Sequence, residues 1–413
     1  MRVNTERLWD DLEQLGTIGH DPRDGGITRI AFSPQDMEAR EFIKGLITST
    51  GMQVSVDAVG NVIGSLKGEL DSPAIAVGSH LDTVIGGGRF DGTVGVLAGV
   101  ECARVIRESC YPLKHPIEVI AFSDEEGTRF GRGTLGSRAL AGFLDPADFH
   151  ALKDRDGATL WQVLSAQGFA PERAELSRRA VNSYLSYLEL HIEQGPVLAA
   201  SGISIGIVES IAGILRHQLK IEGESNHAGT TPMSCRRDAL VVAARGVGMV
   251  PEILQTYGEG MVGTVGRFEI SPGVPNVIPG LALMTIELRG RSQSKLDQCS
   301  QEILREVRAL ADRSGLSLEV RETVRTEPME MNSRVIQTIE KECHDLGVSY
   351  RRMNSGAGHD AIWMAKNWPT GMLFVPSADG ISHGPREFTD PLHVTLGAQV
   401  LLNTILSIDQ WEG

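Results

Sequence analysis

The sequence predicts an α/β protein in which a small α+β sandwich interrupts a larger domain built on a mixed sheet. Four apolar strands each run into a polar, glycine-rich loop: residues 74–77 into GSHLDT, 117–122 into SDEEGTRFG, 187–190 into HIEQG and 372–375 into PSADGISHG. In α/β sheets such loops gather at the carboxyl ends of the strands, so a reactive site is expected there. Between residues 212 and 326 the order strand, helix, strand, strand, helix, strand is typical of a ferredoxin-like sandwich.

The expected elements follow the chain in order. Leucines at 8, 12 and 15 share one face of an N-terminal helix, and short strands alternate with helical patterns from residue 54 onward. In the interrupting segment we expect strands over 216–222, 264–270, 281–288 and 317–324, and helices over 237–254 and 296–314. The chain is therefore expected to divide into 1–211, 212–326 and 327–413, with the first and third segments forming one catalytic domain.

Composition excludes several classes of protein. The 413 residues are 41% hydrophobic and 22% charged, enough for a sizeable core and unlike a disordered chain. The net charge of −14 repels phosphate backbones, which argues against a nucleic-acid partner. The apolar runs are shorter than the roughly 20 residues of a membrane helix, and the N-terminus lacks a signal-like apolar core. Five scattered cysteines without a CxxC pair indicate a reducing compartment, so we expect a cytoplasmic protein with no membrane partner.

The first candidate motif pairs a histidine with an aspartate two residues later. His80 can offer a neutral imidazole nitrogen to a metal, and the Asp82 carboxylate is placed to accept the other ring N–H. In GGGRFDG, the two oxygens of Asp91 can bridge two cations. Alone, a histidine after a strand is more commonly a surface residue, and an Asp-Gly pair is usually a turn. The combination indicates a metal site.

The second motif is a run of adjacent carboxylates, Asp124, Glu125 and Glu126, after an apolar strand. Neighbouring carboxylates repel one another unless a cation or a proton compensates. A solvated acidic loop is the common alternative. The apolar strand before the run and the glycine-rich loop after it favour one glutamate as a metal ligand and its neighbour as a general base.

Two further histidines complete a mixed set of ligands. His191 ends a strand in LELHIEQG, and His383 lies in ISHGP. With His80, Asp91 and Glu126 they supply nitrogen and oxygen ligands that suit Zn²⁺ or Mn²⁺, with Co²⁺ as a further option. Two such ions sharing Asp91 would polarise a water molecule and a carbonyl together.

Taken together, these motifs resemble those of the M20 peptidase superfamily, and within it the hydantoinase/carbamoylase group. That group includes N-carbamoyl-L-amino acid hydrolases, β-ureidopropionases and allantoate amidohydrolases. The resemblance runs almost from end to end and is carried by GGITR, GSHLDT, GGGRFDG, DEEGTRF, LELHIEQGPVL, NHAGTTPM, NVIPG, NSGAGHDA and ISHGP. It implies a metallopeptidase-like catalytic domain with an inserted dimerisation and lid domain, and a binuclear metal-dependent amidohydrolase acting on non-peptide carbon–nitrogen bonds.

The resemblance also implies roles for individual residues. One metal would be held by His80, Asp91 and His191, and the other by Asp91, Glu126 and His383. Glu125 matches the general base, and Asp82 matches the residue that orients His80. Positions that match substrate contacts are Gln194, His227, Asn276, Arg289 and Gly358.

Several of these substrate contacts have a plausible chemistry of their own. His227 and Asn276 could stabilise a developing oxyanion. Arg289 could grip a substrate carboxylate through two hydrogen bonds, although an ordinary surface salt bridge is the alternative. His359 could line the pocket beside Gly358 or brace its loop through Asp360. The family's small domain mediates dimerisation, and its counterpart of His227 reaches the neighbouring subunit's site, so a homodimer is expected.

Arg216 bears on the substrate, which is expected to be a small ureido carboxylate. Allantoate carries two ureido groups and offers extra acceptors to a guanidinium, whereas hydrolases of carbamoyl amino acids usually show an aromatic residue at the matching position. FVPSADGISH and EPMEMN also favour allantoate, while GTLGSRALAG resembles the carbamoylases. We expect allantoate, a compound of purine catabolism, to give ureidoglycine, ammonia and carbon dioxide. An N-carbamoyl-L-amino acid hydrolase or β-ureidopropionase is the alternative, and Arg216 would then be a solvated strand residue.

Two other hypotheses predict different behaviour. An aminoacylase or dipeptidase would hydrolyse acyl-amino acids and leave carbamoyl compounds intact. A non-catalytic sensor with the same fold would lack a ligand or the base, whereas this sequence retains all of them.

Overall fold

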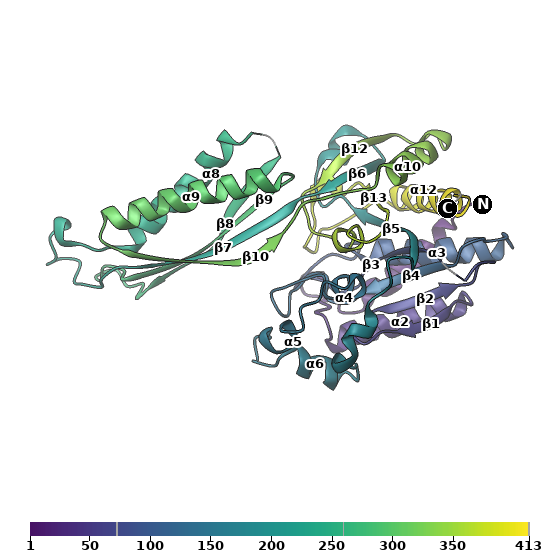
Figure 1. Ribbon diagram of the computed structural model, residues 1–413, viewed down its shortest axis with the longest axis horizontal. Coiled ribbons are helices and arrows are strands. Elements are labelled where there is room, and N and C mark those ends of the chain that lie inside the picture. Colours follow the sequence, from purple (N-terminus) through teal and green to yellow (C-terminus); the bar gives the residue numbers. More distant parts are fainter. Residues whose placement is uncertain (72, 259, 412–413) are drawn as a thin grey trace. The chain divides into compact units, whose positions relative to one another are not determined.

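The computed structural model describes residues 1–71, 73–258 and 260–411 (Figure 1). The chain forms two compact units. The larger contains Met1–Glu209 together with Glu330–Gly413, and the smaller contains Ser210–Met329. The smaller unit interrupts the larger one in the sequence, next to the expected divisions at 211/212 and 326/327. The roles expected for the inserted segment 212–326, in dimerisation and as a lid, stay predictions.

Within the described residues, the larger unit is centred on a mixed sheet of nine strands in the order β1-β2-β4-β3-β5-β13-β6-β11, with β12 pairing with β6. Neighbours among β4, β3, β5 and β13 are parallel, whereas the β1–β2, β2–β4 and β13–β6 pairs are antiparallel. The predicted α/β class is therefore confirmed. The strands are β1 (Gln53–Val56), β2 (Val62–Leu66), β3 (Ala74–His80), β4 (Ile117–Phe122), β5 (Tyr184–Ile192), β6 (Ile205–Ile211), β11 (Met329–Glu330), β12 (Tyr350–Ser355) and β13 (Thr370–Val375).

Helices surround this sheet. All seven residues of β3 are buried, as is typical of a parallel strand covered on both faces. Helix α3 packs against β3, β4 and β5, and α12 packs against α3, α10 and β13. The helices are α1 (Thr5–Thr17), α2 (Pro34–Ser49), α3 (Thr93–Glu108), α4 (Leu135–Ala141), α5 (Asp148–Ala151), α6 (Leu160–Ala166), η1 (Pro171–Ser177), α7 (Val197–Ser201), α10 (Ser333–Asp345), α11 (Ala361–Met364), η3 (Ala378–Gly380) and α12 (Pro391–Asp409).

The sheet brings the predicted reactive loops together. In the parallel register His80 lies opposite Phe122, and His191 lies opposite Phe374. The carboxyl ends of β3, β4, β5 and β13 therefore lie along one edge of the sheet, and the loops that follow them emerge there.

The smaller unit is an α+β sandwich. Its sheet, as described, has four strands in the order β10-β7-β9-β8, and its chain order β7-α8-β8-β9-α9-β10 is the predicted one. Burial alternates along β7 and β9, and α8 and α9 lie on the same side of the sheet (Figure 1). The other face carries Arg216, Glu287 and Arg289 together with apolar side chains such as Leu281 and Leu283. The elements are β7 (Gly213–Glu222), η2 (Met233–Cys235), α8 (Ala239–Thr256), β8 (Met261–Ser271), β9 (Leu281–Gly290), α9 (Gln293–Arg313) and β10 (Ser317–Thr326).

Two helices among the described residues, α8 and α12, are long and apolar enough to cross a membrane when judged by length and composition alone. The expectation that the apolar segments are all too short was therefore too strict. Each of these helices contributes a buried face to the core of its own unit: α8 packs against α9, β8 and β9, and α12 packs against α3 and the sheet.

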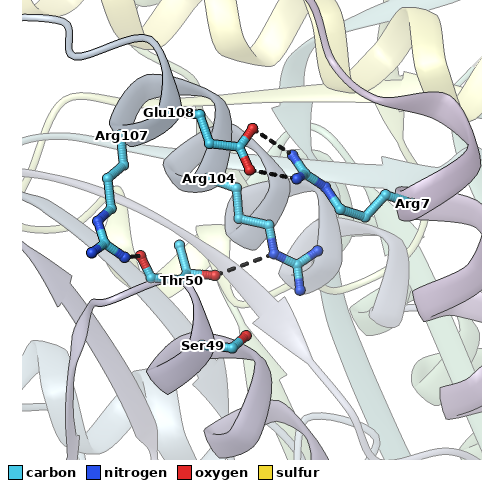
Figure 2. Close-up of a pocket in the computed structure, with 6 residues that line it drawn as sticks. All are labelled: Arg7, Ser49, Thr50, Arg104, Arg107 and Glu108. Carbon is cyan, nitrogen blue, oxygen red and sulfur yellow. Dashed lines mark hydrogen bonds and ion pairs between the residues drawn. The ribbon is translucent and has the colours of Figure 1, made fainter.

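An arginine-lined cavity of about 410 Å³ lies in the larger unit (Figure 2). The guanidinium of Arg7 binds Glu108 at 2.6 Å and the buried Glu101 at 2.8 Å. Arg104 bonds to the Thr50 hydroxyl, and Arg107 to the Thr50 carbonyl at the end of α2. Cations beside the last carbonyls of a helix are stabilising. These arginines therefore fasten helix ends, and we assign the cavity a structural role.

Glu101→Ala tests this role. The substitution removes one of two acidic partners from Arg7, which keeps Glu108, and from the buried Arg104, which keeps Asp11. We therefore expect the free energy of unfolding to fall by about 2 kcal/mol. Thermal and denaturant unfolding followed by circular dichroism measure the change. Glu306→Ala, which removes the partly exposed partner of the exposed Arg305, is the control and should change stability by no more than about 0.5 kcal/mol. Equal effects of the two substitutions would contradict the assignment.

Candidate metal centre and active site

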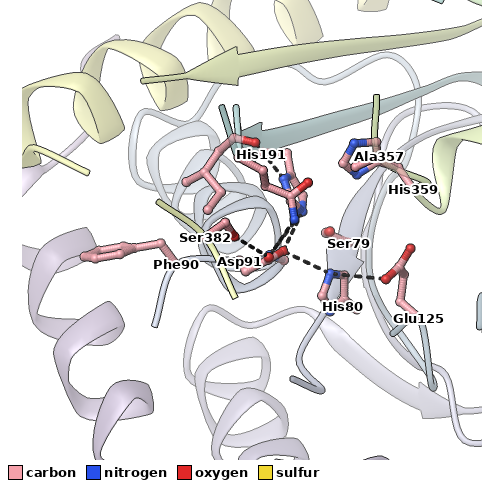
Figure 3. Close-up of polar contacts among 12 residues, drawn as sticks. Ser79, His80, Phe90, Asp91, Glu125, His191, Ala357, His359 and Ser382 are labelled. Carbon is pink, nitrogen blue, oxygen red and sulfur yellow. Dashed lines mark hydrogen bonds and ion pairs between the residues drawn. The ribbon is translucent and has the colours of Figure 1, made fainter. Parts of the chain in front are cut away.

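Three buried side chains form the first candidate metal group (Figure 3). His80 is the last residue of β3, His191 lies near the end of β5, and Asp91 lies in the loop before α3. Oδ1 of Asp91 is 3.1 Å from Nε2 of His191 and 3.6 Å from Nε2 of His80. One ligand atom from each residue lies within 4.8 Å of the others.

A second group shares Asp91 with the first. Nε2 of His383 is 3.1 Å from Oδ2 of Asp91 and 3.5 Å from Oε1 of Glu126. The candidate ligand atoms of these residues also lie within 4.8 Å of one another. Each oxygen of Asp91 therefore faces a different set of partners: Oδ1 faces His80 and His191, and Oδ2 faces His383. The other four predicted ligands therefore lie around the carboxylate of Asp91.

Main-chain carbonyls orient His80 and His191, the two histidines of the first group. Nδ1 of His80 is 2.9 Å from the carbonyl oxygen of Asp82, and Nδ1 of His191 is 2.9 Å from that of Ile192. A proton on Nδ1 donated to a carbonyl leaves the lone pair of Nε2 directed at Asp91, as a metal ligand requires.

The structure corrects the predicted role of Asp82. Its carboxylate lies 3.9 Å from Nδ1 of His80, too far for a hydrogen bond, and accepts the backbone N–H groups of Glu125 and Glu126 at 3.1 Å each. The turn after β3 brings the Asp82 carbonyl, instead of its carboxylate, to the imidazole. The carboxylate thus positions the two glutamates, and the carbonyl positions His80.

Glu125 faces the first group. Its Oε2 lies 3.7 Å from Nε2 of His80 (Figure 3), and burial, followed by Asp360 and Glu126, raises the pKa of its carboxyl well above the ordinary value. Gln194 lies at the second group, where its amide Nε2 is 2.7 Å from Oδ2 of Asp91 and 3.3 Å from Nε2 of His383.

His359 closes its own loop. Its Nε2 is 2.8 Å from the hydroxyl of Ser355, which also accepts the backbone N–H of Ala357. Ser355 thus braces the His359 side chain, a partner that neither of the two alternatives for His359 named. The ring of His359 packs edge-on against His191 with centroids 4.5 Å apart, and Gly358 precedes it in the loop.

In the smaller unit, the predicted oxyanion residues lie side by side. His227 bridges to Val277, and the backbone N–H of Ala228 donates to the carbonyl of Asn276 at 2.9 Å. Nδ1 of His227 accepts the N–H groups of Gly229 and Thr230 at 3.0 and 3.2 Å. A neutral His227 must then carry its proton on Nε2, where it can act as a donor.

Arg216 and Arg289, the two arginines predicted to contact the substrate, both bind Glu287, a residue that the sequence analysis did not single out. Glu287 lies opposite Arg216 in the β7–β9 register, two residues before Arg289 on the same face of β9. Arg216 binds Oε2 of Glu287 through Nε at 2.8 Å and Nη2 at 2.5 Å. Arg289 binds Oε1 through Nε at 2.9 Å and Nη2 at 2.8 Å. The sequence did offer a signal for the contact between Glu287 and Arg289. They are two residues apart in the strand segment ELRGR, and residues two apart in a strand share a face.

Comparison with known proteins decides the family. A family model described as peptidase family M20/M25/M40 matches residues 76–407. The chain belongs to the M20 peptidase family. It is 38% identical over 411 residues to an N-carbamoyl-L-amino acid amidohydrolase from Geobacillus stearothermophilus, covering 99% of this chain and 100% of that protein. It is 35% identical over 397 residues to an allantoate amidohydrolase from Escherichia coli, covering 96% of each.

A solved structure supports the same family. The hydantoinase/carbamoylase family amidase from Burkholderia multivorans matches with a TM-score of 0.89 and 34% identity, covering 100% of this chain and 99% of that one. This M20 family member is therefore a hydrolase of the amidohydrolase type, acting on non-peptide carbon–nitrogen bonds. The sensor hypothesis required a missing ligand or base, and every predicted one is present in the site.

The donor set of this M20 hydrolase fits divalent metal ions, as expected in a family of metal-dependent hydrolases. Burial opposes ionisation of Asp91, but contacts with His191, His383 and His80 lower its pKa well below the ordinary value. The contact with Asp91 raises the pKa of His383 to about 9, while burial and Asp91 raise that of Glu126 to about 7. Carboxylates crowded in this way are relieved by a cation between them.

A third set of potential ligands lies beside the first. Glu189, His191 and His359 bring ligand atoms within 4.8 Å of one another. The oxygens of Glu189 already accept hydrogen bonds from the hydroxyls of Ser79 and Tyr187, at 2.9 and 3.1 Å, and from the N–H of Ala361. These bonds assign Glu189 to bracing the strand ends and leave the two groups at Asp91 as the metal candidates.

Asp91→Asn should abolish divalent-metal binding at both groups, because it replaces one charged oxygen with an amide that donates hydrogen. His191→Ala should weaken only the group that contains it. Metal content after equilibrium with Mn²⁺ or Zn²⁺, measured by mass spectrometry, distinguishes the two variants. His344→Ala, an exposed histidine, is the control. Full metal content in Asp91→Asn would show that the carboxylate is not shared.

Proposed function

We propose that this M20 family amidohydrolase uses two divalent metal ions to hydrolyse the ureido group of a small carboxylate, and that its substrate is allantoate. The products would be ureidoglycine, ammonia and carbon dioxide, from the addition of one water molecule. The observation that carries the proposal is the position of Asp91, whose two oxygens belong to two candidate metal groups with Glu125 beside one of them.

His80, Asp91 and His191 would hold one ion, and Asp91, Glu126 and His383 the other. When bound, the ions would activate a water molecule and polarise the ureido carbonyl. Zn²⁺ and Mn²⁺ both suit this mixed set of nitrogen and oxygen donors.

Glu125 is proposed as the general base. Its carboxylate takes a proton from the attacking water and returns a proton to the nitrogen of the breaking carbon–nitrogen bond. The backbone N–H of Glu125 donates to the Asp82 carboxylate at 3.1 Å. Asp82 therefore positions the base through its carboxylate and His80 through its main-chain carbonyl. Positive charge at the metal groups would oppose the raised pKa of Glu125 and favour its ionised form.

His227 and Asn276 are proposed to stabilise the oxyanion that forms as water adds. The two hydrogen bonds accepted by Nδ1 of His227 leave Nε2–H as the donor, which supports this role. Gln194, Gly358 and His359 are proposed to line the substrate pocket.

The charges around Arg216 support a substrate with one carboxylate. Arg216 and Arg289 share the single negative charge of Glu287, so the three side chains together carry one positive charge. Arg216 uses one edge of its guanidinium, Nε and Nη2, for Glu287. Its Nη1 has no protein partner in the parts of the chain that the structure describes, which leaves a donor for a second ureido group. Arg289 is proposed to bind the carboxylate.

An N-carbamoyl-L-amino acid is the alternative substrate. It is favoured by the relative from Geobacillus stearothermophilus, which is named for that activity and is 38% identical to this chain. The same metal groups and the same base would serve both substrates.

A homodimer formed through the smaller unit is proposed as the working assembly. β8 is an edge strand of its sheet, and Val262, Phe268 and Ile270 on it are exposed. An exposed apolar edge strand is an open template for pairing with another chain.

Ammonia release decides between the two substrates. With the metal-loaded protein we expect kcat/KM for allantoate to exceed that for N-carbamoyl-L-methionine, because Arg216 offers a donor that only the second ureido group can use. If kcat/KM is instead higher for N-carbamoyl-L-methionine, the proposed substrate changes from allantoate to an N-carbamoyl-L-amino acid. Hydrolysis of neither, together with turnover of acyl-amino acids, would overturn the proposal.

Glu125→Gln should keep the metal content of the wild type and lower kcat by about 10²–10⁴-fold, because it removes the base and leaves the ligands in place. The exposed residue Glu172 supplies the control substitution, Glu172→Gln, which should leave kcat unchanged. Wild-type turnover in Glu125→Gln would remove this residue from the mechanism.

A further inference from the structure

Glu387, a buried glutamate in the loop before α12, lies between the loops that carry Asp91 and His383. Its carboxylate accepts hydrogen bonds from two segments of the chain. Oε1 accepts the backbone N–H groups of Phe90 at 2.8 Å and Asp91 at 3.1 Å. Oε2 accepts the hydroxyl of Ser382 at 2.8 Å and the backbone N–H of His383 at 3.3 Å. Only 5% of the residue is exposed.

We propose that Glu387 is the positioning residue that sets the distance between Asp91 and His383, and so builds the second metal group. Asp91 and Glu387 are 296 residues apart in the sequence. Both segments are loops, so their relative position depends on side-chain contacts more than on a strand ladder. A single rigid carboxylate that bonds to the backbone of both ligands holds them in register. This inference rests on the proposed function, because it assumes that the group holds a metal.

The hydrogen bonds of Glu387 assign it to bracing the two loops. Each of its oxygens accepts two donors, and three of the four donors are backbone N–H groups. Its partner Ser382 lies between two acceptors, at 2.8 Å from Oε2 of Glu387 and 3.0 Å from Oδ2 of Asp91. A hydroxyl has one proton, so it can serve only one of them at a time. A cation held by Asp91 would compete with this hydroxyl for the Asp91 carboxylate and leave the Ser382 proton to bond to Glu387.

The neighbouring residues are shaped to admit this carboxylate. A Cβ at Gly88 would lie 2.1 Å from the carboxyl carbon and Oε1 of Glu387, so residue 88 must be a glycine for the approach to occur. Phe90 and Phe388 flank the pair of loops, with their ring centroids 5.9 Å apart and edge-on, and Trp9 contacts both rings. Because Glu387 is 5% exposed, its bonds to the two loops face little competition from water.

Glu387 also supports an unfavourable turn. His383 adopts a φ of 56°, in the left-handed region that residues with a Cβ rarely occupy. The N–H of that same residue donates to Glu387. Loss of this acceptor would let the turn relax and move the imidazole of His383 away from Asp91.

Glu387→Gln in the full chain tests the proposal. Titration of the metal-free protein with Mn²⁺, followed by calorimetry, measures the affinity of each class of site without using activity. We expect the class that contains His383 to weaken by about 10–100-fold. The other class should weaken less, because it shares Asp91 but its histidines, His80 and His191, do not contact Glu387. The control is Asp409→Asn, which alters another fully buried carboxylate that accepts two backbone N–H groups, from Lys114 and His115. It should leave both classes unchanged.

Gly88→Ala provides a second route if Glu387→Gln does not fold. The added methyl group pushes against the Glu387 carboxylate without removing it, and it should weaken the same class of site. Unchanged Mn²⁺ affinity, or equal weakening of both classes, in the folded variants would overturn the inference. If the wild-type protein binds no divalent ion at all, the proposed function fails as well. If the wild-type protein binds two Mn²⁺ ions and Glu387→Gln binds them with the same affinities, this inference fails but the proposed function stands.

Discussion

The structure of the site depends on one buried carboxylate that is shared by two groups of ligands. Oδ1 of Asp91 faces His80 and His191, while Oδ2 faces His383. Burial of an ionised carboxylate is unfavourable unless positive charge compensates it. Here three imidazoles surround it, and their contacts lower the pKa of Asp91 well below its ordinary value. The acidic residues beside it, Glu125 and Glu126, have raised pKa values for the complementary reason: they are buried close to other acids.

The fold supplies this arrangement from distant parts of the chain. The carboxyl ends of parallel β3 and β5 carry His80 and His191, and the loops after β3 and β4 carry Asp91 and Glu125. Two buried acids then connect these loops by bonding to backbone N–H groups. Asp82 holds the Glu125–Glu126 pair, and Glu387 joins the Asp91 loop to the His383 loop. Asp82 and Glu387 therefore position the loops that carry the candidate ligands, without being candidate ligands themselves.

Local pattern was enough to predict much of this. The four strands that run into reactive loops were predicted, as were the helices and strands of the smaller unit, because apolar runs and alternation are visible in a single stretch of sequence. The five candidate ligands were also found, since each follows a strand or sits in a glycine-rich loop. What escaped were contacts between distant residues. The choice between the carbonyl and the carboxylate of Asp82 depends on the turn geometry. Glu387 and Glu287 gain their roles only from partners that the fold brings to them.

A crystal of the full chain soaked with Mn²⁺ tests the central claim most directly. Anomalous scattering is predicted to show two ions about 3.5–4 Å apart, one at each oxygen of the Asp91 carboxylate, with His191 at the first and His383 at the second. Ions bound away from Asp91, or a single ion held by only one of its oxygens at saturating Mn²⁺, would contradict the account.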